Sequence, residues 1–451
     1  IPSAMPAPGD PLLLVPRPRS VERRPGHVRV HRGLTDEVDQ LLARRHLRAT
    51  NYEPRHGLGL FTGMPAAHPE AYLLTIEPSE REGINVSVSA QGDVGVRNGL
   101  RTLKQLLRQF DDRRLPCVEI HDEPAFATRG VMLDVSRDKV PTMEQFREVA
   151  DLLASLKFNH LQLYTEHAFA YGGHEEVWAE ASPLTAEEIR ELDHYCSARG
   201  VELAANQNCF GHLAAFLNRP RYNHLAEIEG DNAWRFMQWE RRGPFSLCPV
   251  LPESEAFVRE LLGQLIPNFR SPLVNIGCDE TFDVGWGRSK EAVARAARPW
   301  IASLGEADAF ARARAELFFD FVNRICAIVR EHGKRPLMWA DIAMTHPDML
   351  DRLGKDVVGL AWCYEPPPEA KFSEEVAYLR RHGLEAWVCP GTSSWRSITG
   401  RTTESQANML TAAACAGEAT GLLVCDWGDA GHMQQWPITM TRLADAAEAA
   451  A

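Results

Sequence analysis

The chain has 451 residues, of which 45% are hydrophobic and 24% are charged, a composition typical of a globular protein. Its formal net charge of −12 disfavours contact with a phosphate backbone, so we expect no nucleic-acid partner. No apolar run approaches the ~20 residues that cross a bilayer, and we expect no membrane partner either. A chain of this length exceeds what one hydrophobic core usually supports, which predicts two domains.

The ten cysteines are spread along the chain and show no spacing typical of metal sites or of a disulfide framework. Several of them fall in apolar runs, where a free cysteine behaves as a small hydrophobic side chain. The first residues lack the basic and then apolar layout of a signal peptide. We therefore expect a cytoplasmic protein without a metal or cofactor, while the oligomeric state stays open.

Residues 1–123 are predicted to form a small α+β domain. Hydrophobic and polar residues alternate over 71–76 and 84–88, which indicates two strands. Val96, Leu100, Leu103 and Leu107 follow at helical spacing. The simplest arrangement packs this helix on an antiparallel sheet.

Residues 124–451 alternate strands with helices, the pattern of a parallel sheet. The predicted helices include 142–156, 185–199 and 308–332, and the predicted strands are 130–135, 160–165, 201–205, 273–277, 336–340, 357–363, 385–389 and 421–425. Eight such units fit a (β/α)8 TIM barrel, so the predicted fold class is α/β with the small α+β domain in front. The alternative, an open doubly wound sheet, lacks the glycine-rich motif that would open its first unit. Little chain follows the eighth strand, and we expect a truncated C-terminal end.

The carboxyl ends of the predicted strands carry an acid pair and several tryptophans. Asp279 and Glu280 follow the fourth strand, where barrels place their chemistry, although acids at such positions also cap helices. Strand alternation would point the two side chains to opposite faces, which does not suit an acid and a nucleophile at one bond. An acidic pocket with flat aromatic walls suits a pyranose ring and predicts a carbohydrate ligand. The other strand ends supply Glu166, His212, Trp339, Trp362, Trp395, Trp427 and Asp429.

The order of these motifs resembles glycoside hydrolase family 20, the β-N-acetylhexosaminidases, over nearly the whole chain. The resemblance is carried by the segments 14–18, 129–137, 211–212 and 277–280, which read LVPRP, RGVMLDVSR, GH and GCDE. It implies an exo-acting enzyme that removes terminal β-linked GlcNAc or GalNAc. It also implies retention of configuration, through attack by the substrate's own 2-acetamido oxygen.

The resemblance also implies roles for single residues. Glu280 would protonate the leaving group and later activate water, and Asp279 would orient the acetamido group and stabilise the oxazolinium-like intermediate. A Glu166–His212 pair would assist the acid. Arg129, which precedes the first strand, would grip ring hydroxyls together with Asp429.

Besides Cys278 in the acid motif and Phe210 in place of a proline, three departures from the family pattern indicate an outlying, bacterial-type subgroup. The family has a tyrosine after the seventh strand that binds the acetamido oxygen, whereas residues 391–396 read GTSSWR. Tyr364 and the N–H of Trp395 are both candidates to replace it, and the sequence does not separate them. Glu166 stands about where the family has an aspartate, and Asn208 replaces another.

Two other functions stay open on the residues alone. A sugar-binding barrel without catalysis would keep the aromatic pocket and lack turnover. A glycosidase with a carboxylate nucleophile would use Asp341 or Asp426 and would act on sugars that carry no acetamido group.

Overall fold

The computed structural model describes residues 12–78, 83–110, 114–396, 402–429 and 431–451. Its N-terminal part contains a five-stranded sheet, in the order β1 (Ser20–Arg29), β5 (Arg114–Asp122), β3 (Tyr72–Ile76), β4 (Val86–Ala90) and β2 (Leu58–Phe61). Neighbouring strands are antiparallel except for β2, which runs parallel to β4. The α+β prediction is confirmed, and the expectation of a wholly antiparallel sheet is wrong at β2.

Helix α2 (Asp93–Gln109) packs on this sheet, and α1 (Leu34–Ala43) lies beside it. Val96, Leu100 and Leu103 are buried, as their helical spacing predicts. A Cβ atom at Gly99 would stand 2.4 Å from the Val88 side chain on β4. The close approach of α2 to the sheet therefore requires glycine at this position.

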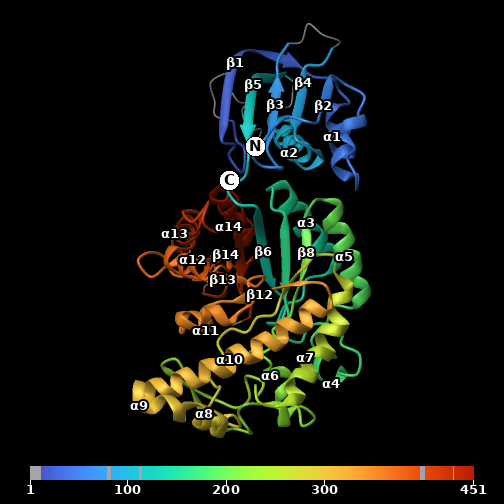
Figure 1. Cartoon of the computed structure of the whole chain (residues 1–451). Helices are drawn as coiled ribbons and strands as arrows, with labels where there is room; N and C mark the ends of the chain where they lie inside the picture. Colours follow the sequence, from blue (N-terminus) through green and yellow to red (C-terminus); the bar gives the residue numbers. More distant parts are fainter. Residues whose placement is uncertain (1–11, 79–82, 111–113, 397–401, 430) are drawn as a thin grey trace.

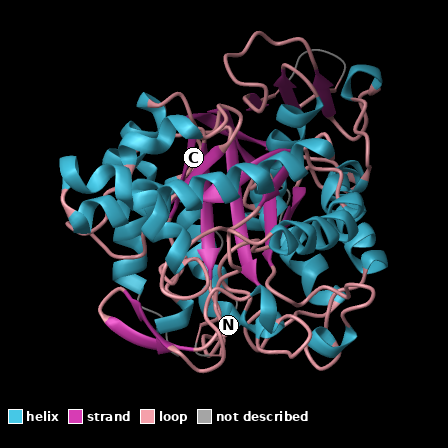
Figure 2. Ribbon diagram, turned by 60° about the horizontal axis from the view of Figure 1, so that its bottom comes forward, coloured by secondary structure: helices cyan, strands magenta, loops and turns pink. Residues whose placement is uncertain are grey.

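Eight parallel strands close a barrel in the order β11-β12-β13-β14-β15-β6-β7-β8. Figure 2 shows these strands surrounded by helices. The TIM-barrel prediction is confirmed, and every predicted strand lies within two residues of its predicted bounds. The strands are β6 (Thr128–Asp134), β7 (His160–Tyr164), β8 (Glu202–Asn206), β11 (Leu273–Asn275), β12 (Arg335–Trp339), β13 (Val358–Trp362), β14 (Glu385–Cys389) and β15 (Gly421–Asp426).

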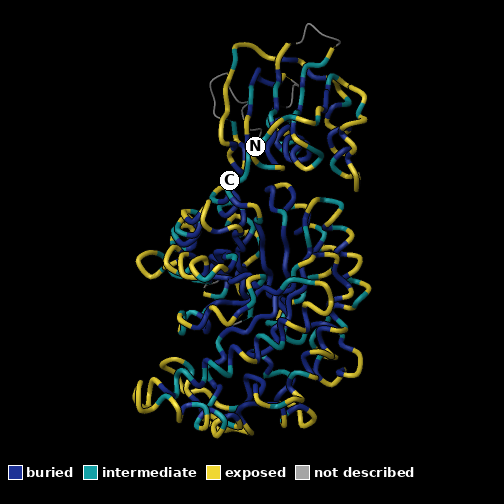
Figure 3. Tube along the Cα trace, viewed as in Figure 1, coloured by how far each residue is buried: buried dark blue, intermediate teal, exposed yellow. Residues whose placement is uncertain are grey.

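Helices bury their apolar faces against the outside of the barrel, and buried residues follow the strands in Figure 3. The outer helices are α3 (Met143–Ser155), α5 (Ala186–Ala198), α7 (Pro252–Leu265), α10 (Glu306–Glu331), α12 (Phe372–Arg381), α13 (Thr402–Ala413) and α14 (Trp436–Ala449). Shorter elements are α4 (Glu175–Trp178), β9 (Ala233–Phe236), β10 (Trp239–Arg242), α6 (Ala214–Leu217), α8 (Lys290–Ala297), α9 (Ile301–Leu304) and α11 (Asp341–Met344). Among the described residues, no helix has the length and apolar character needed to cross a bilayer.

The N-terminal domain meets the barrel at the amino ends of its strands (Figure 1). Lys157, which precedes β7, donates to the carboxylate of Asp122 at 2.7 Å and to the hydroxyl of Tyr72 at 2.9 Å. Arg101 of α2 donates to the carbonyl oxygen of Arg199 at the end of α5. Polar side chains thus hold this interface together.

Arg129 belongs to this interface. Its guanidinium pairs with Glu70 of the N-terminal domain at 2.5 Å and donates to the carbonyl oxygens of Phe126 and Lys157 at 2.8 Å each. The predicted role of Arg129 in sugar binding is therefore wrong. The residue lies at the amino end of β6, whereas barrel chemistry is built at the carboxyl ends.

We expect Arg129→Ala to lower stability and to leave sugar affinity unchanged. Arg129 is 4% exposed, and its loss would leave the Glu70 carboxylate buried with two amide donors but without its cation, at a cost of about 3–5 kcal/mol. Urea unfolding measures this cost. The matched control is Arg330→Ala, because the Arg330–Asp356 pair lies at the surface and such pairs contribute about 0–1 kcal/mol. Equal losses in the two variants would contradict the assignment.

Candidate active site

A cavity of about 170 Å³ opens at the carboxyl ends of the barrel strands. It is lined by Arg137, His212, Asp279, Glu280, Trp339, Trp362, Tyr364, Trp395, Trp427 and Asp429. A larger cavity lies between α1, α2 and α3 at the domain interface, but it lacks a comparable group of acids and aromatic rings. Chemistry rather than size identifies the strand-end cavity as the candidate site.

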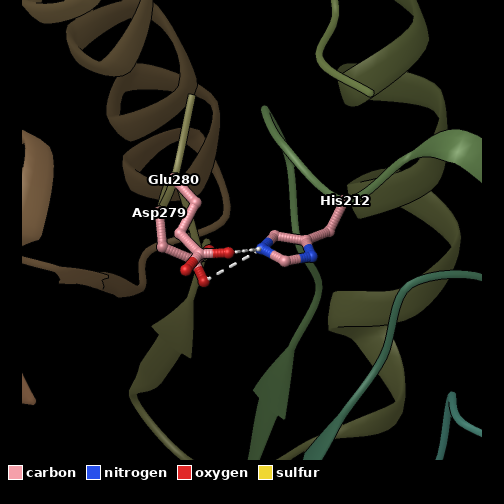
Figure 4. A group of neighbouring side chains, drawn as sticks. All are labelled: His212, Asp279 and Glu280. Atoms are coloured by element: carbon pink, nitrogen blue, oxygen red, sulfur yellow. Dashed lines mark ion pairs between the residues drawn. The ribbon is translucent and has the colours of Figure 1, made fainter. Parts of the chain in front are cut away.

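The acid pair lies on a tight turn directly after β11. Gly277, Cys278 and Glu280 all have positive φ angles, of 67°, 70° and 55°. The turn explains why β11 ends at Asn275 instead of the predicted Gly277. It also overturns the expectation from strand alternation, because the carboxylates of Asp279 and Glu280 converge on His212 instead of pointing to opposite faces (Figure 4).

Residues from the neighbouring strands hold this turn. Asn208, after β8, donates to Asp279 Oδ1 at 2.8 Å and accepts from the N–H of Cys278 at 3.3 Å. A Cβ atom at Gly277 would stand 2.5 Å from the Asn208 side chain, so glycine permits this contact. On the other side, Asp341 after β12 accepts from the N–H of Glu280 at 2.9 Å.

His212 lies at the centre of the acidic groups. Its Nε2 is 3.3 Å from Asp279 Oδ2 and 3.3 Å from Glu280 Oε2, and its Nδ1 is 3.5 Å from Glu166 Oε1. The Phe245 ring packs against the imidazole at 4.7 Å between centroids. His212 caps no helix, since Leu213 stands at the N-cap of the following α6 without a side-chain cap bond.

The ionisation of this group follows from its surroundings. Burial disfavours the charged form of His212, but Asp279 and the other carboxylates outweigh burial and raise the pKa of His212 well above 6.5. Burial would also raise the pKa of Asp279, and there the His212 cation and the Asn208 donor prevail and lower the pKa below 3.8. Both shifts favour the ion pair, in which His212 is an imidazolium and Asp279 a carboxylate.

Arg137 is the arginine that reaches the pocket. It pairs with Asp134 Oδ2 and Glu166 Oε1 at 2.9 Å each, and its Nε lies 3.6 Å from Asp429 Oδ1. The guanidinium lies 5.0 Å from the centroid of the Tyr164 ring. Arg137 follows the carboxyl end of β6, whereas Arg129 is the second residue of this strand, at its amino end. Strict use of the strand-end rule would have selected Arg137 from the sequence.

The aromatic walls come from four consecutive strands. Trp339 and Trp427 lie 6.0 Å apart between ring centroids. Tyr364 stacks on Trp362 at 5.2 Å and meets the edge of Trp395 at 4.8 Å. The Nε1–H of Trp427 donates to the Tyr364 hydroxyl at 2.7 Å. The structure thus brings the four predicted tryptophans and Tyr364 to one pocket.

One imidazole and two carboxylates are also a set that binds metal ions, and the ligand atoms of His212, Asp279 and Glu280 lie within 4.8 Å of one another. A metal requires the lone pair of a neutral imidazole. The raised pKa of His212, which three carboxylates bring about against burial, favours the imidazolium instead. With His212 Nε2 at 3.3 Å from both carboxylates, the three side chains form an ion-paired centre.

Asp341 and Asp426, the candidates for a carboxylate nucleophile, are engaged elsewhere. Asp426 accepts from the hydroxyl of Thr392 at 2.5 Å and lies outside the pocket lining. Asp341 also lies outside the lining, bound to the peptide of Glu280. These contacts disfavour the reading in which either carboxylate attacks a sugar.

Sequence reasoning missed the hairpin of β9 and β10, which belongs to the long segment between β8 and α7. Phe236 of β9 packs on Phe282 at 5.3 Å, two residues after Glu280, and Phe245 supports His212. Alternation of Trp234 and Phe236 was the available signal for a strand here. The hairpin and Phe245 thus provide apolar packing beside the acid pair.

Family models match both parts of the chain. Residues 126–393 match the catalytic domain of glycosyl hydrolase family 20, and residues 12–123 match domain 2 of the same family. A β-hexosaminidase of Vibrio furnissii is 25% identical over 427 residues, covering 86% of this chain and 64% of the relative. A β-hexosaminidase of Akkermansia muciniphila is 25% identical over 313 residues, covering 63% of this chain and 58% of the relative. The chain thus matches about three fifths of the length of these curated relatives.

Solved structures share the fold at low sequence identity. An exo β-N-acetylglucosaminidase from Vibrio harveyi has a TM-score of 0.71 and 20% identity, with 100% of this chain and 74% of that chain covered. A β-N-acetylhexosaminidase from Streptomyces coelicolor A3(2) has a TM-score of 0.67 and 19% identity, with coverages of 97% and 90%. Given the two family models, which together extend over most of its length, the chain belongs to glycosyl hydrolase family 20.

Proposed function

We propose that this chain is an exo-acting β-N-acetylhexosaminidase that removes terminal β-linked N-acetylglucosamine or N-acetylgalactosamine. The observation that carries the proposal is the adjacent pair Asp279 and Glu280, both 3.3 Å from His212 at the wall of an aromatic pocket. The β-hexosaminidase names of the curated relatives support it.

In the proposed reaction the acetamido oxygen of the substrate attacks C1, and the bond from C1 to the glycosidic oxygen breaks. Glu280 transfers its proton to the departing oxygen. Water then attacks C1, gives a proton to the Glu280 carboxylate and opens the oxazolinium ring. Two inversions at C1 retain the configuration, and no protein carboxylate acts as the nucleophile.

Asp279 serves as the negative group in this reaction. As a carboxylate it accepts the acetamido N–H and offsets the positive charge that develops on the oxazolinium ring. It remains ionised because His212 and Asn208 lower its pKa against the effect of burial. The ion-paired centre therefore favours the negative charge of Asp279 before the substrate binds.

The pocket suits a single terminal sugar. A cavity of about 170 Å³ is small, and its tryptophan walls fit the C–H faces of a pyranose ring. Arg137 and Asp429, 3.6 Å apart, offer a donor and an acceptor for ring hydroxyls. We propose that this pair takes the place that the sequence suggested for Arg129 and Asp429, and that it makes the enzyme exo-acting.

Paired aryl substrates test the proposed function. The para-nitrophenyl β-glycoside of N-acetylglucosamine should be hydrolysed with retention, and its counterpart with a 2-hydroxyl group should react at least about 10²-fold more slowly. Product configuration is read by NMR immediately after mixing. Equal rates on the two substrates would favour a carboxylate nucleophile, and binding without turnover would favour a sugar-binding barrel.

We expect Tyr364, and not Trp395, to donate to the acetamido oxygen. The Tyr364 oxygen already accepts from Trp427, so the group it offers to a ligand is its own O–H, and burial raises its pKa well above 10. Tyr364→Phe should lower kcat on the acetamido substrate by ~10²-fold, the usual effect of losing one such donor. Trp395→Phe should retain more activity, and Tyr378→Phe on the exposed side of α12 is the control. A larger loss in Trp395→Phe would reverse the assignment.

The acidic side of the pH profile should depend on His212. His212→Ala removes the cation that lowers the pKa of Asp279, and burial would then raise it, so more Asp279 is protonated at a given acidic pH. The acidic limb of kcat/KM should move up by about one pH unit or more. His174→Ala is the matched control, because His174 is buried beside Tyr222 and Glu260 outside the pocket. An unmoved limb in His212→Ala would show that the ion pairs do not set the ionisation of Asp279.

A further inference from the structure

Asp341 is bound to the backbone of the residue that we propose as the acid. It is the first residue of α11, two positions after Trp339 at the end of β12. Its Oδ2 accepts from the N–H of Glu280 at 2.9 Å, and its Oδ1 is also buried. Since β12 is a direct neighbour of β11 in the barrel, this bond ties the turn of the acid pair to the adjacent strand end.

The hydrogen bond to Asp341 stabilises a strained backbone conformation at Glu280. Its φ of 55° lies in the left-handed region, which costs a non-glycine residue about 1–2 kcal/mol. A more extended backbone would be less costly and would turn the Glu280 carboxylate away from Asp279 and His212. Within the turn, the Glu280 carbonyl oxygen accepts from the N–H of Phe282 at 2.7 Å. The backbone N–H and C=O of Glu280 are therefore both hydrogen-bonded, the first to Asp341 and the second to Phe282.

We propose that Asp341 is a positioning residue that holds the Glu280 peptide in its left-handed conformation and thereby aims the acid at the glycosidic oxygen. The inference rests on the proposed function, in which Glu280 donates that proton. Asp341 does not touch the substrate in this scheme, since it lies outside the pocket lining.

The charge state of Asp341 suits this role. Burial, followed by the nearby carboxylates of Asp279 and Glu280, raises the pKa of Asp341 to about 8, and the Glu280 N–H and Trp362 act in the opposite direction. This shift favours the neutral carboxylic acid at neutral pH, which accepts the peptide N–H without adding a further negative charge to the acid pair. Asparagine has the same shape, is also neutral and keeps an acceptor oxygen.

The test compares two substrates whose leaving groups differ in how much they depend on protonation by the acid. N,N′-diacetylchitobiose has a poor leaving group and needs protonation, whereas an aryl N-acetylglucosaminide with a good leaving group needs little. Asp341→Ala should lower kcat on the disaccharide by ~10²-fold with little change in KM, and on the aryl substrate by less than ~10-fold. Glu280→Gln supplies the reference pattern for a lost acid. Asp341→Asn should stay within about threefold of the wild type on both substrates, because it keeps the acceptor.

Asp426→Asn is the matched control, since it alters a buried acid at the end of β15 that is bonded to Thr392. Any loss there should be equal on the two substrates. Equal losses on both substrates in Asp341→Ala, or a changed substrate ratio in Asp341→Asn, would overturn the proposal. If the Ala variant does not fold, Asp341→Leu, which also lacks the acceptor but keeps more of the side-chain volume, is measured in its place. A wild-type protein that cleaves neither acetamido substrate would instead refute the proposed function.

Discussion

A buried imidazolium among carboxylates is the contact on which the pocket depends. His212 connects the loop after β8 to the turn after β11 and to Glu166 after β7. Carboxylates brought this close repel one another, and one of them would take up a proton if no cation lay between them. The His212 cation therefore attracts the carboxylates of Asp279 and Glu280 and lowers the pKa of Asp279.

The barrel supplies this geometry through adjacent strands. In the closed sheet, β11 lies between β8 and β12. A residue just after each of these two strands contacts the turn that carries Asp279 and Glu280. Asn208 binds Asp279 from one side, and Asp341 binds the Glu280 peptide from the other. The positive φ angles of Cys278 and Glu280 strain the turn, and such strain persists where the surroundings over-determine the conformation. Two adjacent acids can thus face one cation.

The two ends of the barrel have different tasks, and this explains the principal error of the sequence reasoning. Arg129 lies at the amino end of β6 and Arg137 follows its carboxyl end, and at ~3.3 Å per residue the strand from Arg129 to Asp134 alone spans roughly 16 Å. The first is paired with Glu70 and joins the N-terminal domain to the barrel, whereas the second lines the pocket. Both arginines belong to the segment 129–137 that resembles the family, so only the end of the strand at which each lies distinguishes their roles.

The barrel, the preceding domain, the acid pair and the aromatic strand ends could all be predicted from the amino-acid sequence, because hydrophobic periodicity and strand-end position are local properties. The sequence did not determine that β11 stops at Asn275, that Glu280 adopts a left-handed conformation, or that Asp341 is bound to its peptide. Those features depend on contacts between residues about 60 positions or more apart, which only the closed barrel brings together. The ionisation of His212 also required the tertiary structure, since burial and the carboxylates around it act in opposite directions and only their distances decide which prevails.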